Sequence, residues 1–107
     1  KEILPRMKIV SAIIPNDVAT NDYVKICSML KLQNANLDTA ANAKIVLVYK
    51  RDKFKSNDEH AVDIIIEVDA PTYKFYVTNG NRLRIGWSAC RVYDGVFLHA
   101  LAVVVST

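Results

Sequence analysis

The sequence predicts a mainly β domain, an antiparallel sandwich or barrel of six to seven strands with a meander over residues 61–93. Residues 61–69 alternate apolar and polar side chains with period two, as a half-buried strand does. An Asn-Gly pair inside 73–87 is typical of a β-hairpin turn. Strand-like runs recur about every 12 residues, a spacing typical of sandwiches and barrels. If residues 21–32 form a helix, the class becomes α+β.

Residues 7–14 are a short apolar run rich in β-branched side chains and closed by Pro15, so we expect a first strand there. Residues 21–32 fit two periods. A helix capped near Thr20 or Asn21 gathers one apolar stripe, Tyr23, Ile26, Cys27 and Leu30. A strand instead turns inward Val24, Ile26, Leu30 and Leu32. Both interpretations stay open, and we favour the strand because the sequence downstream is β-rich.

The middle of the chain alternates polar connections with strand-like runs. Residues 34–42 are a polar connection with room for one helical turn after Asp38. The near-continuous apolar centre of 44–51 predicts a strand covered on both faces. Residues 52–60 are strongly charged, and we expect a surface loop.

The meander follows from two turns that agree on one register. A three-residue loop, Asn79 to Asn81, pairs Phe75 with Ile85 and places Trp87 in the core opposite Tyr73. A turn over 69–72 joins this hairpin to the strand at 61–69, so that the apolar faces match. After a turn at 94–95, the apolar run 96–105 returns as a last, buried strand.

Size and composition indicate one globular domain, residues 1–107, which we interpret as a fragment or processed part of a longer polypeptide. Apolar residues make up 51% and charged residues 23%, and no run reaches the roughly 18 apolar residues of a membrane helix. The net charge of +3 permits an anionic partner. Two cysteines and the lack of an Asn-x-Ser/Thr acceptor favour an intracellular, cytoplasmic setting with free thiols.

Motifs for catalysis are missing from the sequence. It has no glycine-rich phosphate loop, CxxC, HExxH or GxSxG, so we expect no enzyme, no cofactor and no metal. Cys27 or Cys90 with a histidine could form a thiolate–imidazole pair, but buried structural cysteines are the commoner case. The acidic run ending at His60 sits on the predicted loop, where its ligands would not converge.

Basic and aromatic residues give the better candidate site. The predicted nucleic-acid surface comprises Lys50, Arg51, Lys74, Tyr76, Arg82 and Arg84, because aromatic side chains among cations stack bases and bind phosphates. Asp63 and Glu67 share the predicted face, so an ion-paired solvent face is the simpler interpretation. Ile65 beside Tyr76 forms an apolar island there, a candidate protein interface.

These observations favour a non-enzymatic binding or self-assembly domain, as in coat, matrix or adaptor proteins, with a protein partner or a second copy of the chain. The alternative is a single-stranded nucleic-acid-binding domain that uses the basic and aromatic sheet face. A Cys-dependent enzyme is the third hypothesis.

Overall fold

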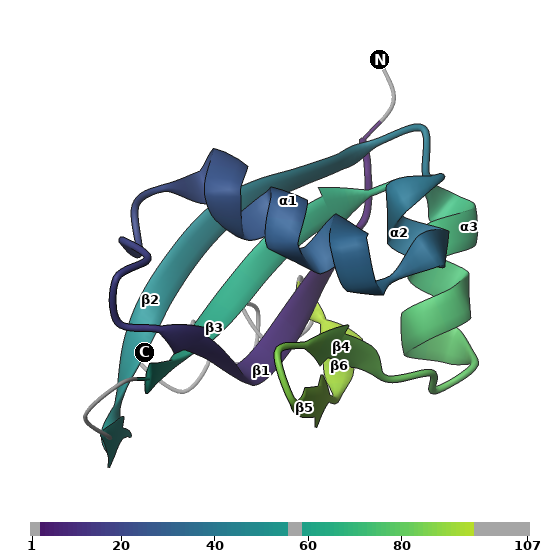
Figure 1. Cartoon of the computed structure of the whole chain (residues 1–107). Helices are drawn as coiled ribbons and strands as arrows, with labels where there is room; N and C mark the ends of the chain where they lie inside the picture. The colour runs from purple at the N-terminus through teal and green to yellow at the C-terminus, as the bar shows by residue number, and fades with distance from the viewer. Residues whose placement is uncertain (1–2, 56–58, 96–107) are drawn as a thin grey trace, which may run out of the picture.

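The computed structural model describes residues 3–55 and 59–95, with the backbone alone for 51–55. Within these ranges the chain forms six strands and four helical segments (Figure 1). They are β1 (Arg6–Pro15), α1 (Tyr23–Gln33), α2 (Ala35–Asp38), β2 (Ala43–Lys55), β3 (Glu59–Val68), α3 (Ala70–Tyr73), the π-helical turn η1 (Lys74–Thr78), β4 (Leu83–Ile85), β5 (Ser88–Cys90) and β6 (Val92–Asp94).

Four strands form one antiparallel sheet in the order β2-β3-β1-β6, and β4 pairs with β5 in a separate hairpin. Apart from the inserted β4–β5 hairpin, the chain runs strand, helix, strand, strand, helix, strand, and β1 and β3 lie at the centre, as in a split β-α-β sheet. The prediction of a mainly β, antiparallel domain is confirmed. The sheet does not close into a barrel, and helices cover one of its faces (Figure 1).

The core lies between the sheet and these helices. Met7 and Ile9 of β1 and Ile64 of β3 are fully buried, and they belong to one cluster with Ile26 and Leu30 of α1. Burying a side chain of this size stabilises the fold by roughly 1.5–3 kcal/mol relative to leaving it in water. The apolar side chains of the central strands and of α1 therefore pack together in one layer.

Residues 21–32 form a helix, so the preference for a strand was wrong. The Asp22 carboxylate accepts a hydrogen bond from the Lys25 amide at 3.2 Å and caps α1. Ile26 and Leu30, one helical turn apart, point into the core. Leu32, which a strand would bury, is 85% exposed. The helical stripe expected from the sequence is the face that packs.

The predicted 61–93 meander is wrong, because β3 is a central strand with β1 on one side and β2 on the other. Residues 70–78 are helical instead. Asp69 precedes α3 and accepts a hydrogen bond from the Thr72 hydroxyl, and Pro71 lies in the first turn, where its missing N–H costs nothing. Alternation over 73–77 also satisfies a helical period, and these helix-start signals decide between the two.

The Asn-Gly pair ends this helix and makes no hairpin turn. Asn79 donates its amide to the Lys74 carbonyl at 2.9 Å, and Gly80 follows with a φ of +74°, the left-handed conformation common after a helix. The hairpin forms later, between β4 and β5, around Gly86 (φ +57°) and Trp87. Trp87, predicted to be in the core, is 100% exposed.

Smaller expectations are also corrected. The loop predicted over 52–60 is shorter, because β2 continues to Lys55 and β3 begins at Glu59. The strand at 44–51 is covered on one face only, since Leu47 and Tyr49 are exposed. The predicted strand 96–105 lies outside the described residues. No helix within 3–55 and 59–95 is long and apolar enough to cross a membrane.

Candidate functional site

The face of the sheet opposite α1 carries a mixture of apolar, aromatic and charged side chains. No helix within the described residues covers this side (Figure 1). We call it the open face and define it by nine residues: Arg6, Lys8, Lys44, Leu47, Tyr49, Asp63, Ile65, Glu67 and Tyr93. Strand alternation places them there, because their neighbours along β1, β2 and β3 point into the core.

Strand register aligns four of these side chains in one row across the sheet. Leu47 of β2 pairs with Ile65 of β3, Ile65 pairs with Lys8 of β1, and Lys8 pairs with Tyr93 of β6. Tyr49 lies in the adjacent row, opposite Asp63. The two tyrosines thus stand on the two edge strands, three strand spacings or about 14 Å apart.

Both tyrosines are accessible, and a cation lies between them. Tyr49 is 38% exposed and Tyr93 is 39% exposed. The Lys8 ammonium lies 5.6 Å from the centroid of the Tyr49 ring, within the range of a cation–π contact. The same ammonium is 3.9 Å from a carboxylate oxygen of Asp63. The centre of the open face therefore combines aromatic surface with a positive charge held in place.

Asp63 holds this part of the sheet in shape. The register between β1 and β3 shifts between Ile9 and Ala12, and Ser11 adopts a φ of +57° within that bulge. The Asp63 carboxylate accepts a hydrogen bond from the Ser11 amide at 3.0 Å. Because a left-handed conformation is strained for a residue with a side chain, this bond stabilises the bulge. Asp63 thus serves both the backbone and Lys8.

Charges elsewhere on the open face are largely balanced. The Arg6 guanidinium bonds the Glu67 carboxylate at 3.1 and 3.2 Å. Lys44 pairs in register with Glu67 on the edge strand. Attraction for an anion is therefore modest on the face itself, and the side chains best suited to recognition are the aromatic ones.

The six residues predicted as a nucleic-acid surface do not come together on one sheet face. Lys50 is exposed in the middle of β2, and the side chain of Arg51 is outside the described ones. Lys74 and Arg84 lie on η1 and β4, away from the main sheet. Tyr76 is only 2% exposed, so it is not accessible for stacking. Arg82 lies in the loop before β4, where it shares a cavity with Tyr76.

The predicted apolar island of Ile65 and Tyr76 is also separated. Ile65 lies on the open face between Leu47 and Lys8, while Tyr76 is the buried residue of η1 and packs in the core. Register explains the difference, because strand β1 occupies the position that the meander assigned to residues 73–78. Ile65 remains a candidate contact residue, and its neighbours are those of the open face.

The two cysteines lie in different surroundings, since Cys90 is buried and Cys27 is partly exposed. Both are free thiols. Burial raises the pKa of the Cys90 thiol, which disfavours the reactive thiolate. The Cys27 thiol donates to the Ala43 carbonyl at 3.8 Å. The His60 ring bonds Asn16 through Nδ1 at 2.7 Å, and its pKa is lowered by burial and then by the charge of Lys50.

Lys8, Tyr49 and Tyr93 are the open-face residues that the sequence did not identify as a group. Lys8 lies between the buried residues Met7 and Ile9, so its side chain points away from the core, and this local pattern is the signal that could have identified it.

Comparisons with protein-family models, with curated proteins and with solved structures find no match. The geometry of the open face is therefore the basis for a proposed function.

Proposed function

We propose that the domain binds single-stranded nucleic acid on the open face, with Tyr49 and Tyr93 as stacking surfaces and Lys8 between them. The observation that supports this proposal is the pair of accessible tyrosines on the two edge strands of a sheet whose helices pack on the opposite side. Bases of single strands stack on sheet aromatics in this manner, largely without regard to sequence. A sheet of this topology does not by itself establish a function, so the proposal rests on the two exposed tyrosines.

The chemistry of the face fits an unpaired strand better than a duplex. A flat sheet with separated aromatic rings offers surface to bases that are free of their partners, whereas a duplex presents its phosphates outward. Lys8 can meet a phosphate or a base edge, and Ile65 and Leu47 provide apolar surface beside the rings. The balanced charges allow the face itself few phosphate contacts, so binding to it alone should be weak and should depend only slightly on salt.

Fluorescence anisotropy with a labelled single-stranded oligonucleotide at low salt tests the proposal. Tyr49→Ala and Tyr93→Ala are each expected to weaken binding by about 5- to 150-fold, corresponding to roughly 1–3 kcal/mol for one stacked base. Trp87→Ala is the matched control, because it removes an exposed aromatic from the β4–β5 turn. Absence of binding by the unaltered protein, or equal affinity of all three variants, would rule the proposal out.

A second function, protein contact or self-assembly, is favoured by Trp87. This side chain is fully exposed at the tip of the β4–β5 hairpin. The hairpin is fixed to α1 by Gln33, whose amide donates to the Gly86 carbonyl at 3.0 Å and accepts from the Gly86 amide at 2.6 Å. Exposed Leu32 is adjacent in the chain to Gln33. Rigid tryptophans often dominate protein interfaces.

Sedimentation of the purified domain over a range of concentrations tests this second function. Self-assembly through Trp87 predicts a mass that rises with concentration and a Trp87→Ala variant that stays monomeric. Tyr93→Ala, on the open face, is the control and should associate like the unaltered protein. A monomer at every concentration would exclude self-assembly and leave only contact with a different protein.

A further inference from the structure

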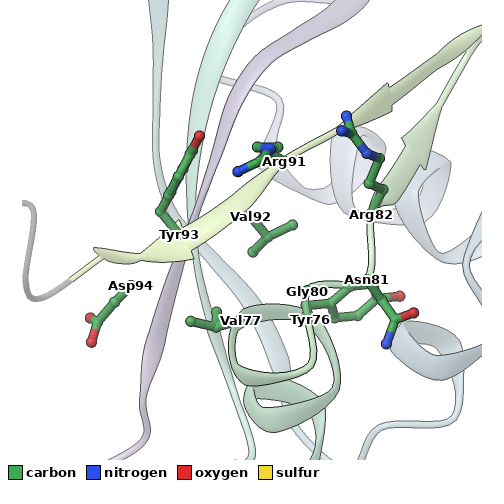
Figure 2. A pocket seen from close by; sticks show the side chains of 9 residues that line it. All are labelled: Tyr76, Val77, Gly80, Asn81, Arg82, Arg91, Val92, Tyr93 and Asp94. Carbon is green, nitrogen blue, oxygen red and sulfur yellow. The ribbon is translucent and has the colours of Figure 1, made fainter.

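A polar cavity of about 270 Å³ opens beside the edge of the sheet, between η1, the loop before β4 and strand β6 (Figure 2). Its lining combines two arginines, an asparagine and two tyrosines with a single acidic residue. The residues that matter for its chemistry are Tyr76, Asn81, Arg82, Arg91, Tyr93 and Asp94. Tyr76 belongs to the apolar core, whereas Asn81, Arg82 and Arg91 are exposed, so the cavity opens at the margin of the core.

Arg82 and Arg91 flank the open end of the β4–β5 hairpin and line the same cavity. Leu83 pairs with Cys90 at the end of this ladder, so one further step of the antiparallel register sets Arg82 opposite Arg91. Both side chains are exposed, and within the described part of the chain neither forms an ion pair. Like charges directly opposite each other destabilise a pair of strands. An anion between the two guanidinium groups would remove that repulsion.

Tyr76 adds a neutral donor to the same cavity. It is 2% exposed, and it lines the cavity together with the two arginines. Burial raises the pKa of this phenol, so it keeps its proton and can donate. The Asn81 side chain donates to the Phe75 carbonyl at 2.8 Å and fixes the loop that carries Arg82. The cavity thus combines two positive charges with a phenolic O–H, beside a loop that a hydrogen bond holds in place.

The single acid in the lining does not oppose an anion at the arginines. Asp94 accepts a hydrogen bond from the Tyr73 hydroxyl at 2.7 Å, which occupies part of its charge. Figure 2 shows Asp94 and Arg82 at opposite sides of the cavity. With two arginines against one carboxylate, the lining keeps a positive balance at the Arg82 side. Arginine is also the side chain best matched to the oxygens of a phosphate.

Tyr93 connects this cavity to the open face. It lines the cavity and is also the β6 member of the row that contains Lys8. A nucleic-acid strand whose base stacks on Tyr93 would bring its backbone past the edge of β6, where Arg91 lies two residues earlier. The balanced charges of the open face leave the phosphates of such a strand without a strong partner, and these arginines would supply one.

We propose that Arg82 and Arg91 form a phosphate-binding cleft that holds the backbone phosphate next to a base stacked on Tyr93. The identity of the phosphate rests on the proposed function. The cleft itself rests on the two arginines and the protonated phenol of Tyr76, which line the same cavity. Arg82 and Arg91 set the salt dependence of binding, while Tyr49 and Tyr93 set its stacking component.

The first test is the salt dependence of oligonucleotide binding between about 50 and 200 mM salt. Arg82→Gln and Arg91→Gln should each lower the slope of log affinity against log salt by about 0.7, the value for one single-strand phosphate contact. Arg84→Gln is the matched control, because it removes the same charge from an exposed site two residues from Arg82. Equal slopes for all three variants would overturn the cleft and leave the proposed function standing.

The second test separates the cleft from the proposed function. Inorganic phosphate is titrated into the labelled protein while the arginine side-chain signals are followed by NMR. Saturable shifts at Arg82 and Arg91, with Arg84 unchanged, would support the cleft even if the oligonucleotide fails to bind. Shifts that do not distinguish Arg84 from the other two would overturn it. A circular dichroism melt of each variant confirms that it is folded.

Discussion

The ammonium group of Lys8 lies 5.6 Å from the centre of the Tyr49 ring, although β3 separates the strands that carry the two residues. The contact reaches over Asp63, whose carboxylate is 3.9 Å from the same ammonium. Lys8 is thus held between an anion and an aromatic ring before any ligand arrives. A cation fixed in this way loses less conformational freedom on binding than a free surface lysine would.

Leu30→Ala should destabilise the domain, while Leu32→Ala should not. Leu30 is fully buried on the core side of α1, and removing a buried leucine side chain costs about 2–5 kcal/mol. Leu32 faces water, and exposed substitutions usually change stability by less than about 0.5 kcal/mol. Urea unfolding of both variants measures the difference. Equal losses would contradict the helical face that the fold assigns to 21–32.

Asp63→Ala should lower the free energy of unfolding by about 1–3 kcal/mol, because it leaves the Ser11 amide of the bulge without its partner. Asp63→Asn should cost less, since an amide oxygen still accepts that hydrogen bond. Both changes free Lys8 from its carboxylate. Urea unfolding at neutral pH gives the comparison, and an Asn variant less stable than the Ala variant would argue against this role of Asp63.

Stability should fall as the pH rises above 10, in part through Tyr73. Burial first, then the hydrogen bond and charge of Asp94, raise the pKa of Tyr73 to about 12. Between pH 10 and 12 the unfolded chain loses this proton while the folded chain keeps it, so unfolding is favoured as pH increases. Thermal melts of the unaltered protein and Tyr73→Phe across this range test the effect. The variant should show the shallower decline, and identical slopes would contradict the assignment.

Local pattern predicted the central strands well. Residues 7–14 are rich in β-branched side chains and residues 61–69 alternate apolar with polar ones, and both segments form central strands whose apolar sides face the core. Helix α1 was ambiguous because Ile26 and Leu30 fit both a helical and a strand period. The order of strands was out of reach, since pairing between β1 and β6 joins segments more than 80 residues apart.

The hairpin predicted for residues 73–87 was wrong because two short-range sequence signals there each fit two different structures. Alternation over five residues fits a helix as well as a strand, and Asn-Gly serves as a helix end as readily as a hairpin turn. Pro71 and Thr72, in the first turn of α3, are the residues that favour a helix over a strand here. The candidate site shifted as a result, because Tyr76 moved into the core and Tyr93 took its place on the accessible face.

The most direct test of nucleic-acid binding on the open face is to map a single-stranded oligonucleotide onto the protein by NMR. If the oligonucleotide binds on the open face, the backbone amide signals of Lys8, Tyr49, Ile65 and Tyr93 should shift together as it is added at low salt. Signals of α1, on the other side of the sheet, should stay in place. Shifts confined to α1 and the Trp87 turn, or no shifts at any oligonucleotide concentration, would contradict binding on the open face.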